Sequence, residues 1–178
     1  MSGVLGAVLA GGRSSRFGTD KAQAHWNGRS LADHAAALIH QHVDRIVIVG
    51  GSGGAVADLP EPGLGPLGGI AGALDFAASQ GFGSVLTIGC DMPSAPAELI
   101  GALLRRAPAY CVDAPVLGHW PAALGAQLMA HLSGADRSVG RWARSVGALP
   151  VASPVALANI NTPADLDALT PDEDLVAP

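Results

Sequence analysis

Residues 3–21, GVLGAVLAGGRSSRFGTDK, join a short apolar run to a loop rich in glycine, hydroxyl groups and cations. The apolar run, residues 3–10, predicts a buried strand. The glycines after it would let backbone N–H groups approach phosphate oxygens. Arg16 and Lys21 would neutralise a polyphosphate and its leaving group. Lys21 is the only lysine beside nine arginines, which favours a role tied to its position. We therefore predict a triphosphate loop at residues 9–21.

Strands and helices alternate through the first hundred residues. Apolar runs predict strands at 3–10, 45–49 and 84–89, and helical patterns occupy 30–41, 68–79 and 96–106. This alternation predicts an α/β fold: a Rossmann-like three-layer sandwich with a mostly parallel sheet. Ligands bind beyond the carboxyl ends of such strands. The loop, the glycines at 50–54 and Asp91 should therefore share one edge of the sheet.

The second half of the chain is less regular. We expect strands at 109–113 and 119–124, helices at 125–132 and 138–146, and a short strand at 157–160. Thr162 and Pro163 have the pattern of a helix start. Residues 1–170 should form a single domain, with residues 171–178 as a flexible acidic tail.

Composition narrows the class of protein. The chain has 178 residues, of which 49% are hydrophobic and 14% charged, enough apolar material for one core. Its formal net charge is −5 and no basic face is visible, which argues against nucleic-acid binding. The apolar runs are too short for a membrane span. Cys90 and Cys111 make no disulfide scaffold, so we expect a soluble, cytoplasmic protein.

Asp91 ends the predicted strand at 84–89 and precedes Met92-Pro93. A carboxylate on the same edge as a phosphate loop is placed to hold Mg²⁺ against phosphates. Taken alone, the residue fits equally well as a cap of the following turn. The neighbouring loop makes the metal role the better interpretation.

Three further segments have alternative interpretations. The glycines at 50–54 lack the spacing of a dinucleotide fingerprint, and a loop near the site is the simpler interpretation. Residues 63–70, GLGPLGGI, fit a base-binding wall or simply a turn before a helix. Asn159 and Asn161 would face one side of a strand and could hydrogen-bond a polar ring system. Asn161 or Thr162 could equally cap the last helix.

The segment LAGGRSSRFGTDK at 9–21 resembles the signature of the MobA-like nucleotidyltransferases. The resemblance continues through GPLGGI at 65–70, CDMP at 90–93 and NINTPADL at 159–166, so it covers nearly the whole chain in order. Within that family, the Asp20-Lys21 ending and the NxNTP motif resemble the molybdenum cofactor guanylyltransferases. That resemblance implies transfer of GMP from GTP to the terminal phosphate of molybdenum-molybdopterin, with Mg²⁺ as cofactor and pyrophosphate as the second product.

The resemblance also implies site residues. The nucleotide would be bound by Leu9, Ala10, Gly11, Gly12, Lys21, Asp58 and Asp91. The catalytic residues would be Arg16, Lys21 and Asp91, and Asp91 would also be the metal ligand. The acceptor would meet Asn159, Asn161 and His119, although a packed strand-end histidine is an equal alternative for His119. Molybdenum cofactor chaperones or target enzymes would be transient partners.

The sequence departs from the family pattern at one point that affects specificity. The family carries an asparagine after its second strand, where this chain has Gly50 or Gly51. A cytidylyltransferase, or a transferase acting on a sugar phosphate, therefore remains an alternative. A nucleotide-binding regulator without turnover is a third, but the retention of both Lys21 and Asp91 argues against it.

Overall fold

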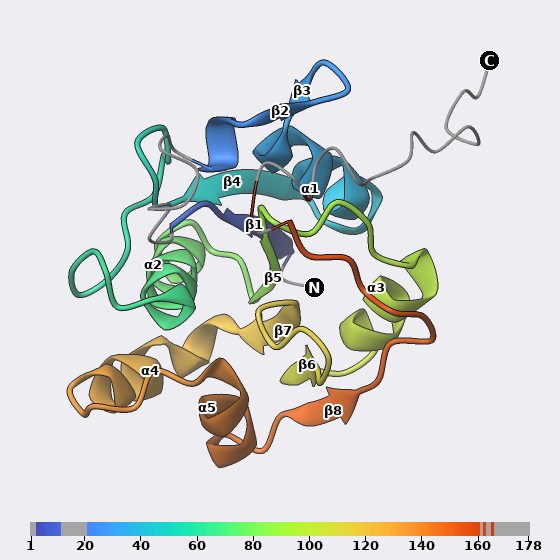
Figure 1. Cartoon of the computed structure of the whole chain (residues 1–178). Coiled ribbons are helices and arrows are strands. Elements are labelled where there is room, and N and C mark those ends of the chain that lie inside the picture. Colours follow the sequence, from blue (N-terminus) through green and yellow to red (C-terminus); the bar gives the residue numbers. More distant parts are fainter. Residues whose placement is uncertain (1–2, 12–20, 161, 163–164, 166–178) are drawn as a thin grey trace.

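The computed structural model describes residues 3–11, 21–160, 162 and 165, and only the backbone at position 21. Its centre is a six-stranded sheet of order β4-β1-β5-β7-β6-β8 (Figure 1). The strands are β1 (Val4–Leu9), β4 (Arg45–Val49), β5 (Ser84–Gly89), β6 (Ala109–Cys111), β7 (Gly118–Pro121) and β8 (Leu149–Val151). β1 runs parallel to β4 and β5, and β7 is antiparallel to both β5 and β6. The predicted mostly parallel sheet is confirmed.

Helices cover both faces of the sheet and give three layers. α1 (Leu31–Ile39) and α3 (Ala97–Leu104) lie on one face, and α2 (Pro66–Ser79), α4 (Gly125–Leu132) and α5 (Val139–Ser145) lie on the other (Figure 1). β1 shows why both faces are apolar. Leu5 and Leu9 belong to the core under α2, whereas Val8 belongs to the core under α1 and α3. Because side chains alternate along a strand, a continuous apolar run fills both cores.

Local sequence signals account for several helix ends. Ser30 caps α1 by accepting a hydrogen bond from the Asp33 backbone N–H at 3.1 Å, as the capping pattern predicts. Pro66 begins α2, where a missing N–H costs nothing. Thr162 and Asp165 hydrogen-bond each other's backbone N–H groups, at 2.7 and 3.3 Å. This reciprocal pair confirms the predicted cap.

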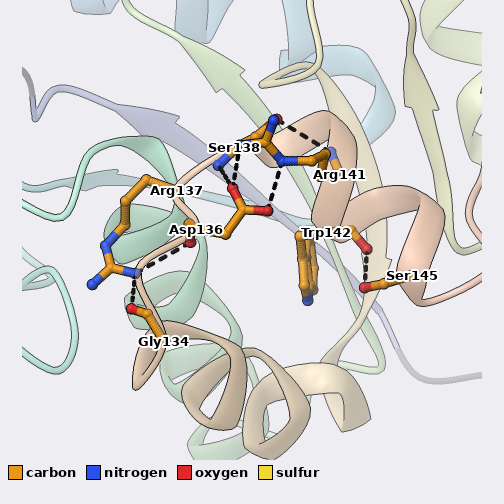
Figure 2. A network of polar contacts seen from close by, with 7 residues as sticks. All are labelled: Gly134, Asp136, Arg137, Ser138, Arg141, Trp142 and Ser145. Carbon is orange, nitrogen blue, oxygen red and sulfur yellow. Dashed lines mark hydrogen bonds and ion pairs between the residues drawn. The ribbon is translucent and has the colours of Figure 1, made fainter.

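An acidic residue organises the connection from α4 to α5 (Figure 2). Asp136 accepts two hydrogen bonds from the Arg141 guanidinium, both at 2.7 Å, and one from the Ser138 N–H at 2.9 Å. Ser138 in turn caps α5. Arg141 holds the pKa of Asp136 well below its usual range through these hydrogen bonds. The network fixes where α5 begins, far along the chain from the nucleotide loop.

Two sequence expectations about strands were wrong or incomplete. Residues 157–160 form no strand, and the edge strand is β8 at Leu149–Val151. The hairpin of β2 (His25–Trp26) and β3 (Arg29–Ser30) was not predicted. Its turn is Asn27-Gly28, with φ values of 47° and 79°, the left-handed pair that a tight hairpin requires. The Asn-Gly dipeptide was the available signal. Among the described residues, no helix is long and apolar enough to cross a membrane.

Candidate active site

Three strand ends meet at the carboxyl edge of the sheet. The Ala10 N–H donates to the Val49 carbonyl at 2.8 Å, and the Cys90 N–H donates to the Leu9 carbonyl at 3.1 Å. The ends of β1, β4 and β5 are therefore fixed beside one another, as the strand pattern predicts. Leu9 and Ala10 are buried and Gly11 is half-buried at this edge. Backbone N–H groups after a strand end are suited to bind anionic oxygens.

Asp58 places its carboxylate among three glycines of this edge. A Cβ built on Gly50 would lie 2.7 Å from Asp58 Oδ1, and one built on Gly11 would lie 3.0 Å from Oδ2. On the α2 side, a Cβ on Gly69 would lie 3.5 Å from Oδ1. A side chain at Gly50 or Gly11 would crowd the carboxylate, whereas one at Gly69 would be in ordinary contact with it. The structure thus brings Asp58 to the end of β1, where the family resemblance implies a nucleotide contact.

The Asp58 carboxylate has an unmet capacity to accept hydrogen bonds. Its Oδ1 atom is buried and has no hydrogen-bond partner among the described residues. Burial raises the pKa of the Asp58 carboxyl. A buried acceptor without a donor costs free energy, and a ligand that brings N–H donors removes that cost.

Asp91 lies half-buried just beyond the end of β5. A Cβ on Gly89 would collide with Asp91 Oδ1, so glycine leaves the room that this carboxylate needs. Among described residues, no group of three His, Cys, Asp or Glu side chains forms a complete metal site. A single carboxylate fits a Mg²⁺ ion whose remaining ligands are phosphate oxygens and water. The residues present therefore fit a metal that arrives with a nucleotide.

The C-terminal segment returns to the same edge. The Ile160 N–H donates to the Asp91 carbonyl at 2.9 Å, which joins two residues that are far apart in the sequence (Figure 1). Ile160 is buried, and Asn159 before it is exposed. Asn159 is thus held beside Asp91 without the predicted strand. Asn161 lies outside the described residues, as do Gly12 and Arg16.

Lys21 begins a short 3-10 helix, η1 (Lys21–Gln23). Ala22 is buried in the core under α1, which anchors this helix after the loop. The position of the Lys21 side chain lies outside what the structure describes. Residue 21 follows the glycine-rich loop, and η1, which begins at this residue, packs on α1.

His119 lies away from this edge. It pairs with Leu86 in the middle of β5, and its ring is 6% exposed. Its Nδ1 is 3.2 Å from the Leu103 carbonyl, which can only accept, so Nε2 accepts from the Ser84 hydroxyl at 2.8 Å. Burial lowers the pKa of His119, outweighing its backbone hydrogen bonds. The structure therefore favours the packed histidine over an acceptor ligand.

Comparisons with known proteins agree with this geometry. Residues 6–151 match the MobA-like NTP transferase domain, and the chain belongs to that family of nucleotidyltransferases. It is 31% identical over 176 residues to the molybdenum cofactor guanylyltransferase of Rhodobacter capsulatus, covering 92% of this chain and 93% of that protein. It is 41% identical over 109 residues to the enzyme of that name from Xanthomonas euvesicatoria pv. vesicatoria (strain 85-10), covering 60% and 57%.

Solved structures share the fold at lower identity. Molybdopterin-guanine dinucleotide biosynthesis protein A from Archaeoglobus fulgidus aligns with a TM-score of 0.69 at 21% identity, covering 92% of this chain and 95% of that one. The 2-C-methyl-D-erythritol 4-phosphate cytidylyltransferase from Thermus thermophilus aligns with a TM-score of 0.64 at 15% identity, covering 94% and 97%. Both confirm a nucleotidyltransferase architecture.

Proposed function

We propose that this chain transfers GMP from GTP to the terminal phosphate of molybdenum-molybdopterin, releasing pyrophosphate. The observation that carries the proposal is the meeting of Gly11, Asp58, Asp91 and Asn159 at one edge of the sheet. Relatives that align over nine-tenths of the chain are named molybdenum cofactor guanylyltransferases. The glycine edge would hold the nucleotide, and the segment of Asn159 would meet the pterin side of the acceptor.

Little covalent chemistry is required of the protein. The acceptor phosphate is already an anion, so it attacks the α-phosphorus of GTP without a general base. One phosphorus–oxygen bond forms to the acceptor, and the bond to the β-phosphate breaks to release pyrophosphate. In this proposal Arg16 and Lys21 stabilise the charge on the leaving group, and Leu9, Ala10, Gly11 and Gly12 line the nucleotide. The Ala10 N–H is already bonded to Val49, so we propose that N–H groups after it meet the phosphate oxygens.

Asp91 is the proposed metal ligand, and we propose Mg²⁺ as the ion. When bound, this ion would neutralise charge on the phosphate oxygens. The half-buried Asp91 carboxylate beside Gly89 lies where it could bind an ion that neutralises this charge. Asn159 and Asn161 are proposed to bind the pterin ring through their amides. His119 is not retained in this set, because its ring is occupied by Ser84 and Leu103.

Several finer points follow from the same assignment. A chaperone or an apo-enzyme would receive the product transiently. Both cysteines, Cys90 and Cys111, are buried and neither forms a disulfide, which fits a reducing compartment such as the cytoplasm. Transfer of CMP in place of GMP is the main rival, because cytidylyltransferases share this fold.

Replacing Asp91 with asparagine tests the catalytic assignment. We expect turnover to fall at least about 100-fold, because the metal would lose its protein carboxylate. The measurement is pyrophosphate release over a range of Mg²⁺ concentrations. Asp75→Asn, on the exposed face of α2, is the matched control and should keep normal turnover. Near-normal turnover in Asp91→Asn, with an unchanged circular dichroism spectrum, would remove Asp91 from the mechanism.

A further inference from the structure

The loop after β4 presents almost no side chains to the proposed nucleotide site. Residues 50–54 are Gly-Gly-Ser-Gly-Gly, and Gly50 and Gly51 adopt φ values of 72° and 67°. The Gly50 N–H closes the loop by donating to the Val56 carbonyl at 2.9 Å. A Cβ on Gly54 would collide with the Gly50 carbonyl. The loop is therefore a tightly folded backbone wall, and Ser52 is its one residue with a side chain. Other side-chain contacts to a base here must come from another segment.

Two side chains lie against this wall. Asp58 is against Gly50. Gln23 is against Gly53, where a built Cβ would lie 3.1 Å from Gln23 Nε2. A Cβ at position 53 would require the Gln23 amide to shift by a few tenths of an ångström. The glycines of one loop therefore make room for a carboxylate at one end and a carboxamide at the other.

The backbone of Gln23 is held while its side chain stays exposed. The preceding Ala22 is 2% exposed and fixes η1 to the core. The Gln23 carbonyl hydrogen-bonds His25 Nδ1 at 2.9 Å, and the Leu31 N–H donates to the Ala24 carbonyl at 2.9 Å. A fixed backbone that carries an exposed amide is suited to meet a ligand.

We propose that Gln23 reads the base of the bound nucleotide by donating its amide N–H to O6 of guanine. This inference rests on the proposed function and deepens it. Guanine offers two N–H donors and one carbonyl acceptor on its pairing edge, and these match a carboxylate (Asp58) and an amide donor (Gln23). Cytosine offers a single amino donor, N4, and two acceptors, N3 and O2. The Asp58 carboxylate would repel these acceptors where guanine presents its N1–H and N2–H donors. The pair would therefore select guanine without any side chain from the glycine loop.

Equilibrium titration of nucleotides tests the role of Gln23. Gln23→Ala should weaken GTP binding about fivefold, the equivalent of one neutral hydrogen bond. Gln80→Ala, at the exposed end of α2, is the matched control and should bind GTP normally. Gln23→Glu should bind GTP more weakly than Gln23→Ala, because a carboxylate repels O6. Gln23 is exposed, so all three variants should fold.

Two GTP analogues separate Gln23 from Asp58. In 6-thio-GTP the O6 acceptor is replaced by sulfur, and wild-type protein should bind it several-fold more weakly than GTP; this penalty should largely vanish in Gln23→Ala. ITP lacks only the 2-amino group, and its penalty should be unchanged in Gln23→Ala. A full 6-thio-GTP penalty in Gln23→Ala, or unchanged GTP affinity, overturns this inference alone. A wild-type protein with no preference for GTP over CTP overturns both this inference and the proposed function.

Discussion

Asp58 shows how a single residue can lower stability in favour of binding. Its carboxylate is packed against Gly11 and Gly50, and Oδ1 is buried without a partner among the described residues. Burial raises the pKa of this carboxyl. The charged form is therefore disfavoured in the folded protein relative to the unfolded chain, and a ligand with N–H donors would relieve the cost.

Asp58→Asn should separate folding from binding. At neutral pH we expect the nucleotide-free variant to be more stable by up to about 1 kcal/mol, a rise in Tm of roughly 2–4 °C. GTP affinity should fall, because the base would lose a carboxylate acceptor. The Tm advantage should shrink as the pH falls through the raised pKa, since wild-type Asp58 then becomes neutral in the folded state. Thermal unfolding from pH 4 to 8 measures this, and a less stable variant at neutral pH would contradict it.

Individual residues also show which contacts could not be predicted from the sequence. The strand pattern assigned Asp91, and the family resemblance assigned Asp58, to the proposed site. The structure places both residues at one edge of the sheet, and their contacts with a nucleotide stay a prediction. His119 was proposed for the acceptor, but its partners Leu103 and Ser84 come from distant segments that spacing alone does not reveal. Gln23 belongs to no motif. Only the folded contact with Gly53 draws attention to it.

Elements are placed by glycine as much as by apolar side chains. Within α2, a Cβ on Gly72 would collide with the Ala57 carbonyl, so this helix packs directly on the backbone that leads to Asp58. The same contact explains why helix formers such as alanine are absent at this position despite their higher propensity. Close approach of α2 is what holds Asp58 at the edge of the sheet.

Gly72→Ala and Gly101→Ala form a matched pair of helix substitutions. Gly72→Ala should destabilise the protein by about 1–3 kcal/mol, because α2 must move away from Ala57. Gly101, in α3, has nothing within 4 Å of a built Cβ, so Gly101→Ala should stabilise by about 0.5–1 kcal/mol. Urea unfolding of the two variants measures the contrast. Equal effects of the same sign would show that the α2 contact is unimportant.

Element prediction succeeded where a local signal was strong. The apolar runs gave β4 and β5 at their observed bounds, and Ser30 marked the start of α1. The strand expected at 157–160 is absent: the Ile160 N–H bonds to the Asp91 carbonyl, but the segment pairs with no described strand. β8 was not predicted. Its Pro150 weakens the sequence signal for a strand, and the strand is recognised by its pairing with β6 at the edge of the sheet.

At the scale of the whole molecule, the proposed sites for GTP and for the acceptor lie next to each other along one edge of the sheet. Gly11, Gly50 and Asp58 lie at the ends of β1 and β4 or beside them, and Asn159 reaches the end of β5 from the far end of the chain. Asp91 lies at the junction. In the proposed reaction, GTP would occupy the first side and the pterin phosphate the second, so that the acceptor phosphate would meet the α-phosphorus of GTP near Asp91.

Pyrophosphate release with each of the four nucleoside triphosphates, with and without molybdenum-loaded molybdopterin, tests the central claim most directly. We predict Mg²⁺-dependent release with GTP in the presence of that acceptor, and background release in every other combination. The dinucleotide product should appear in equal amount. Release with CTP in place of GTP, release with GTP that does not depend on the acceptor, or nucleotide binding without any release would contradict the proposed guanylyltransfer.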